Sequence, residues 1–151
     1  MVYTGKTRLS GNIISTQVDR YRQREGDVMD AMGILKQIAS DMKSELLHGQ
    51  LETFGRLLHE AWVNKKKMAD AISDLQIDGL YDAAMEAGAL GGKVLGAGGG
   101  GHMLFYCPFR KKHLVARTLE SLGAEVVRFN FEPDGLQTWS FHSEPSDSDG
   151  K

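Results

Sequence analysis

A dense run of glycines is the feature of this chain whose residue types and spacing most suggest chemistry. The run reads Gly96, Ala97, Gly98, Gly99, Gly100, Gly101, so five of its six positions are glycine. Glycine loses more conformational freedom on folding than any other residue. Such a run therefore indicates a backbone that turns sharply or lies close against something. On spacing alone, an ordinary hairpin loop stays open as an alternative.

Two common nucleotide-binding motifs do not fit this run. Gly96, Gly98 and Gly101 satisfy the spacing G-x-G-x-x-G, but that motif works where a strand turns into a helix, because the pyrophosphate lies on the helix N-terminus. Here an apolar, strand-like segment at 103–107 follows instead. The Walker pattern also fails, since no Gly-Lys-Ser/Thr closes the run. The sequence predicts a strand–loop–strand, with 93–95 as the first strand.

Helices and short strands must position this loop. Apolar residues spaced three and four apart predict helices near 10–24, 27–48 and 51–70. Ser10 and Asp27 are candidate N-caps for the first two, and Asp78 for a short helix further on. Together with the strand-like segments, this order predicts an α+β fold with helices packed on one face of a mostly antiparallel sheet.

The end of the sequence predicts a β-hairpin. Pro133-Asp134-Gly135 has turn chemistry, because proline presets φ and glycine accepts a positive φ. Apolar residues alternate with polar ones on either side of that turn: Val127, Phe129, Phe131, Trp139 and Phe141. We expect the last two strands to pair around the turn, and residues 143–151 to form a polar tail.

Composition argues against several classes of protein. A net charge of -2 gives no basic face for nucleic acid. Cys107 is the single cysteine, so no intrachain disulfide forms, and we expect a reducing, cytoplasmic compartment. No apolar run approaches the roughly 20 residues that span a bilayer, and the N-terminus has no signal-peptide pattern. The histidines show no ligand spacing, so we expect no protein-bound metal.

The segment 93–101 resembles the third signature of the GHMP kinases, the family of galactokinase, homoserine kinase and mevalonate kinase. In that family this signature is a glycine-rich strand–loop–strand of the C-terminal domain, beside the active-site cleft. Segments 3–10, 102–108 and 128–139 resemble the heptose 7-phosphate kinase branch. The resemblance implies that residues 1–142 form a GHMP kinase C-terminal domain, a ferredoxin-like sandwich.

The same resemblance implies ATP-dependent phosphoryl transfer to a sugar or sugar phosphate. In the family, the N-terminal domain carries a Pro-x-x-x-Gly-Leu-Gly-Ser-Ser-like phosphate loop, the Mg²⁺ environment and, where a member uses one, the catalytic aspartate. This chain contains no such loop. We therefore expect it to supply no catalytic residue, to hold neither ATP nor Mg²⁺ alone, and to be inactive alone. It would be an excised fragment or one product of a split gene.

The resemblance also implies a site and partners. Gly96–Gly101 would be the phosphate and substrate cleft loop, and Thr4, Gly5 and Arg8 would bind substrate, since arginine suits bidentate phosphate binding. A solvated surface arginine is the alternative for Arg8. An N-terminal GHMP kinase domain would be the partner, and it or a second copy in a homodimer would cover an apolar patch near the loop. The alternative function is a stand-alone ligand-binding or protein-interaction module.

Overall fold

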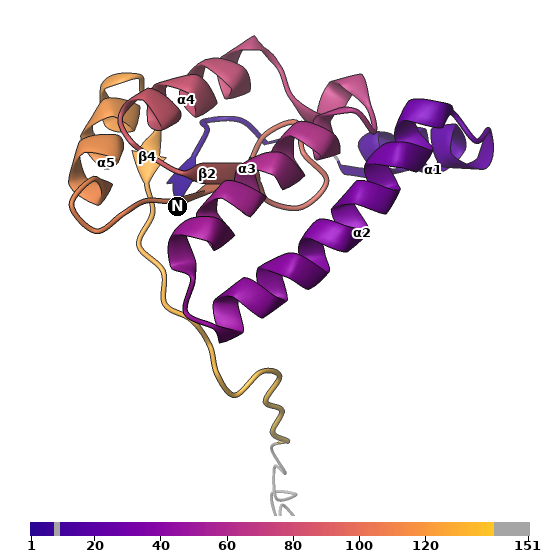
Figure 1. The fold of residues 1–151 in the computed structure, drawn as a ribbon. Coiled ribbons are helices and arrows are strands. Elements are labelled where there is room, and N and C mark those ends of the chain that lie inside the picture. Colours follow the sequence, from indigo (N-terminus) through magenta and orange to yellow (C-terminus); the bar gives the residue numbers. More distant parts are fainter. Residues whose placement is uncertain (8–9, 141–151) are drawn as a thin grey trace, which may run out of the picture.

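The computed structural model describes residues 1–7 and 10–140. These residues form five helices, one 3-10 turn and four strands, and Figure 1 shows how they are arranged. In chain order these are β1 (Val2–Tyr3), α1 (Ser10–Arg22), α2 (Gly26–Leu47), α3 (Leu51–Lys66), η1 (Asp70–Ile72), α4 (Leu75–Glu86), β2 (Gly91–Val94), β3 (His102–Tyr106), α5 (Lys112–Ser121) and β4 (Glu125–Val126).

The strands form one antiparallel sheet in the order β2-β3-β1-β4. Leaving out α1, α2, α3 and η1, the chain runs β1-α4-β2-β3-α5-β4, which is the ferredoxin-like order. The predicted α+β class and antiparallel sheet are confirmed. The three long helices also occupy the predicted ranges, as an insertion between β1 and α4.

The core of the molecule lies where the central strands meet α4 and α5. Val2 is paired with Met103, and Met103 with Val94, so three apolar side chains lie side by side in register. All three are buried, and they join one cluster with residues of the two helices: Ile77, Leu80, Ala84, Val115 and Leu119. Burial of this apolar area supplies most of the driving force for folding.

Helix α3 fastens the inserted helices to the sheet. It lies against α2 on one side and contacts β2 on the other. The approach to β2 is close: a Cβ placed on Gly91 would meet the carbonyl oxygen of Gly55 and would lie 2.6 Å from the backbone nitrogen of His59. Only glycine at position 91 lets the two backbones approach this closely.

Two predicted caps are wrong. Helix α2 begins at Gly26, and Asp27 accepts hydrogen bonds from the adjacent Val28 N–H at 3.0 Å and from the Arg20 guanidinium at 3.1 Å. Helix α4 is capped by Asp74, not Asp78. Both aspartates lie within the first turn, where the backbone is already helical, whereas a cap residue precedes the helix with non-helical backbone.

The predicted C-terminal hairpin does not form in this chain. Strand β4 ends at Val126, and residues 127–140 have no regular secondary structure. Phe141, the last residue of the predicted returning strand, lies outside the described residues. In Figure 1 this segment runs down and away from the helices and the sheet. The physical reason is that an isolated two-stranded hairpin is at best marginally stable in water without a surface to cover its apolar face.

Candidate functional site

The glycine run forms the connection between β2 and β3, as the strand–loop–strand prediction requires. Its backbone takes positive φ at five positions: Gly96 (73°), Gly98 (110°), Gly99 (75°), Gly100 (145°) and Gly101 (83°). Residues with a Cβ rarely adopt such angles. The loop therefore needs its glycines for its shape, and no helix follows it that could bind a dinucleotide.

Thr4 and Gly5, predicted from a distant part of the sequence, lie against this loop. The backbone N–H of Thr4 donates to the carbonyl of Gly101 at 2.9 Å, and the Thr4 hydroxyl donates to the same oxygen at 3.0 Å. Gly101 N–H in turn donates to the Lys6 carbonyl at 2.7 Å. The fold thus brings two of the predicted site segments together. Arg8, the other predicted substrate residue, lies outside the described residues.

The other side of the loop is held by η1. Gly99 N–H donates to the carbonyl of Ile72 at 2.8 Å, and a Cβ on Gly98 would lie 2.8 Å from that same oxygen. The loop is therefore clamped between η1 and residues 4–6. Because the N–H groups of Gly99 and Gly101 already donate to protein carbonyls, the loop is better suited to form a rigid wall than to cradle phosphate with these two donors.

A polar bracket around α4 supports the same clamp. The ammonium of Lys6 lies 3.0 Å from Asp74 Oδ2, while Asp74 Oδ1 accepts the N–H of Ile77 at 2.9 Å and caps α4. Gln76 donates through Nε2 to the Thr4 carbonyl at 3.0 Å. The Ile77 N–H, more than the Lys6 ammonium, holds the pKa of Asp74 below its usual range.

Sequence reasoning missed this bracket. The available signal was an aspartate directly before the first residue of α4, the ordinary N-cap position. No local pattern, however, indicates that Lys6 reaches Asp74 across 68 positions of sequence. Together Lys6, Asp74 and Gln76 join the first strand, the helix and the glycine loop into one rigid unit.

Three further side chains, those of His102, Cys107 and Lys65, are partly buried in the fold. His102 is half-buried with its ring centroid 5.3 Å from that of Tyr3. Cys107 is half-buried, and burial raises the pKa of its thiol, which favours the unreactive protonated form. Burial, followed by the charge of Lys93, lowers the pKa of Lys65.

The described residues contain no group of three or more His, Cys, Asp or Glu side chains placed to hold a metal ion. Within the same residues, no helix has the length and apolar character needed to cross a membrane. The site as built presents a rigid loop with the half-exposed Lys6 ammonium beside it. Among the described residues of this site, no nucleophilic side chain is paired with a general base.

Comparison with known proteins finds a family model and several relatives that match this chain. Residues 42–126 match the family model described as GHMP kinases C terminal. The chain is 32% identical over 111 residues to the D-glycero-alpha-D-manno-heptose 7-phosphate kinase of Campylobacter jejuni. The matched region covers 74% of this chain and 33% of that protein. It is 28% identical over 133 residues to the bifunctional fucokinase/GDP-fucose pyrophosphorylase of Arabidopsis thaliana, covering 87% of this chain and 12% of that protein.

A solved structure has the same fold. The mevalonate kinase of L. major, in complex with R-mevalonate, superposes with a TM-score of 0.71 at 18% identity, over 80% of this chain and 36% of that one. The chain therefore spans about a third or less of the length of these relatives. Its glycine loop, its ferredoxin-like sheet and the match over 42–126 show that this chain belongs to the GHMP kinase C-terminal family.

Proposed function

We propose that this chain is the C-terminal, substrate-side part of an ATP-dependent GHMP kinase that phosphorylates a sugar or sugar phosphate, as heptose 7-phosphate kinase does. One observation carries the proposal: the glycine loop 96–101 and the segment 4–6 form a single clamped unit. The heptose 7-phosphate kinase and fucokinase relatives support a sugar as the phosphate acceptor.

In this proposal the chain positions the acceptor and leaves the phosphoryl group to another domain. Phosphoryl transfer depends on placement and on neutralising charge. The glycine loop forms one wall of the cleft, Lys6 brings positive charge beside it, and Thr4, Gly5 and Arg8 contact the substrate. In the proposal, ATP and Mg²⁺ belong to the N-terminal domain, and the enzyme works in the cytoplasm.

The first test is the coding sequence upstream of this chain. We expect it to encode an N-terminal GHMP domain with a glycine- and serine-rich phosphate loop, in the same or the neighbouring reading frame. If no such domain is encoded there, the kinase proposal fails, and a stand-alone binding module becomes the better interpretation.

The second test is reconstitution of activity. The upstream domain, mixed with this chain, should convert ATP to ADP in a coupled assay only when heptose 7-phosphate, mannose or galactose is added as phosphoryl acceptor, and this chain alone should be inactive. Gly99→Val or Gly100→Val should abolish the activity, because misplacement by about 1 Å costs on the order of a hundredfold. Gly33→Ala, on the outer face of α2, is the matched control. Sugar-dependent turnover by this chain alone would contradict the proposed division of labour.

A further inference from the structure

The segment after β4 exposes large apolar side chains. Within residues 127–140, Phe131 is 90% exposed, Leu136 92% and Trp139 76%. Water surrounds these side chains, although aromatic residues are usually among the most buried on average. The described chain therefore does not cover an apolar surface that the sequence concentrates in 14 residues.

The backbone nevertheless bends at residues 133–134, where the sequence predicts the turn of a hairpin. Gly135 has a φ of 69°, and the Asp134 N–H donates to Glu132 Oε1 at 3.0 Å. A three-residue loop with glycine in the left-handed position is a common hairpin connection. With Pro133-Asp134-Gly135 as that loop, Phe129 would pair with Trp139.

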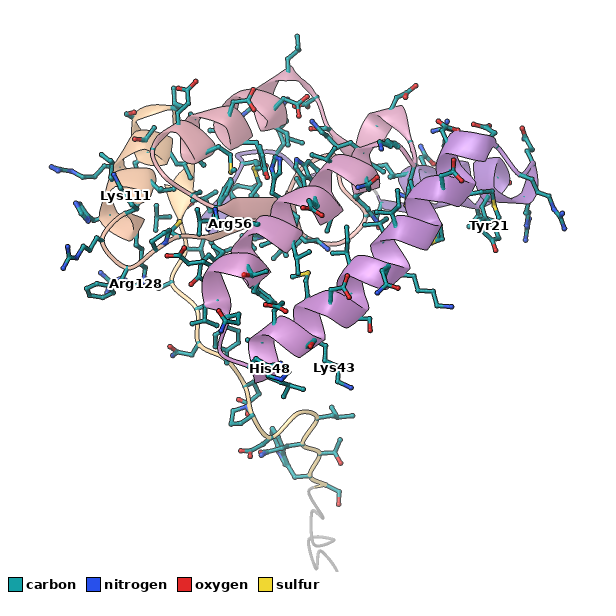
Figure 2. The ribbon with its side chains drawn as sticks, in the orientation of Figure 1. Tyr21, Lys43, His48, Arg56, Lys111 and Arg128 are labelled. Atoms are coloured by element: carbon teal, nitrogen blue, oxygen red, sulfur yellow. The ribbon has the colours of Figure 1, made fainter. Side chains whose placement is uncertain are left out.

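That register would make the hairpin amphipathic. Side chains alternate between the two faces of a strand, so one face would carry Val127, Phe129, Phe131 and Trp139, with Gln137 as its polar member. The opposite face would carry Leu136 and the polar side chains Arg128, Asn130, Glu132, Thr138 and Ser140. Figure 2 shows Arg128 at the base of this segment, beside α5. A hairpin with one aromatic face needs a surface to cover that face.

The base of the segment is attached to the body of the domain. Val127 N–H donates to the Met1 carbonyl at 2.9 Å, which continues the pairing of β4 with β1. Phe129 lines a cavity of about 250 Å³ between α5 and the sheet, with Cys107 and Val115 among the other lining residues. The segment thus leaves the sheet beside the N-terminus of the chain, which Figure 1 marks next to β4.

We propose that residues 127–140 are a docking element that folds as a β-hairpin onto the N-terminal domain of the kinase. This inference rests on the proposed function, which supplies that domain. The Met1–Val127 bond places the base of the hairpin where a preceding domain would join the chain. The family match ends at residue 126, and two thirds of the heptose kinase relative lie outside this chain. A segment that folds on binding loses its conformational entropy when it binds. In this proposal residues 127–140 become ordered only on the N-terminal domain.

Trp139 provides the test. Trp62 is buried and Trp139 is exposed, so iodide quenching of tryptophan fluorescence reports on Trp139. Addition of the upstream-encoded N-terminal domain should suppress this quenching and protect the amides of 127–140 from hydrogen exchange. Phe131→Ser and Trp139→Ser should each weaken binding roughly tenfold or more, because buried aromatics dominate interfaces. Phe109→Ser, at an equally exposed phenylalanine outside the segment, is the control and should leave binding unchanged.

The outcomes separate this inference from the proposed function. Docking through 127–140 without sugar-dependent turnover would support the hairpin and refute the kinase. Turnover that Phe131→Ser and Trp139→Ser leave unchanged would overturn the docking element and keep the kinase. Absence of binding to the N-terminal domain would also overturn the inference. If the amides of 127–140 became protected from hydrogen exchange in the lone chain as its concentration rose, a second copy of this chain would be the occupant instead. Because both side chains are exposed, the lone variants should keep the wild-type far-ultraviolet circular dichroism.

Discussion

The sharpest stability prediction concerns Gly98→Ala in the clamped loop. The added methyl group would lie 2.8 Å from the carbonyl oxygen of Ile72 and 2.9 Å from its Cα, at a φ of 110°. Backbone strain at a left-handed angle costs roughly 1–2 kcal/mol, and overpacking against a fixed neighbour costs about 1–3 kcal/mol more. The blocking atoms are backbone atoms of η1, so rotation of a side chain does not relieve the contact. We expect a loss of about 2–5 kcal/mol.

Two other glycines separate these contributions. Gly96→Ala lies in the same loop at a φ of 73° but meets nothing within 4 Å, so it should lose only the backbone part, about 1–2 kcal/mol. Gly33→Ala lies within α2 with open space around it and should gain about 0.5–1 kcal/mol, as alanine does over glycine in a helix.

The assay is urea unfolding followed by circular dichroism, with the midpoints compared at equal slope. The expected order of stability is Gly33→Ala, then wild type, then Gly96→Ala, then Gly98→Ala. If Gly98→Ala matched Gly96→Ala within about 0.5 kcal/mol, the typical effect of a neutral surface change, then η1 does not clamp the loop. The reasoning about a rigid wall would then be refuted.

Three further predictions follow from the same contacts. Gly91→Ala should lower the free energy of unfolding by about 3 kcal/mol or more, because its methyl group would enter the backbone of α3. The control Gly79→Ala, with open space around it in α4, should be neutral or stabilising. Urea unfolding midpoints measure both changes, and equal midpoints would exclude the close approach of α3. The pKa of Asp74 is held below its ordinary 3.8 by the N–H at the start of α4 and then by Lys6. The stability that the ionised carboxylate contributes is therefore complete above pH 3.8 and is lost as the pH falls through the lowered pKa of the folded state. Asp74→Ala should cost about 0.5–2 kcal/mol near neutral pH and reduce this acid loss; an unchanged acid profile would contradict the cap. Burial raises the pKa of Tyr81 from 10.0 to about 12, so the unfolded chain releases this proton first and stability should fall between pH 10 and 12. Tyr81→Phe should remove that fall, and ultraviolet titration of the folded protein should show one tyrosine ionising near 12.

Local patterns were enough to predict most of the elements. Helix spacing placed α1, α2 and α3 within a few residues of their observed ends, because an amphipathic stripe is written in the order of residues. The glycine loop was also predictable from local sequence. Its five positive φ angles require glycines, so the loop is visible in the order of residues whatever it contacts. The helix caps were less predictable, since Asp74 and Asp78 are both acceptable cap residues.

The C-terminal segment shows where local pattern is insufficient. Alternation and turn residues predict a hairpin, and the chain bends at 133–134 with a positive φ at Gly135. The strands do not form, because pairing two strands requires burial of an apolar face, and the described chain offers no surface for Phe131 and Trp139. A β-strand depends on what lies next to it, whereas a helix closes its own hydrogen bonds.

By itself, the sequence determined the helices, the glycine loop with its strand on each side, the α+β class and the GHMP resemblance. Only the tertiary structure decided that Thr4 and Lys6 clamp the loop on one side while Ile72 holds it on the other. It also decided that Asp74 ties Lys6 to the start of α4. The reason is that hydrogen bonds between backbone groups carry no side-chain signature, so partners distant in the chain are identified only once the sheet has brought them together.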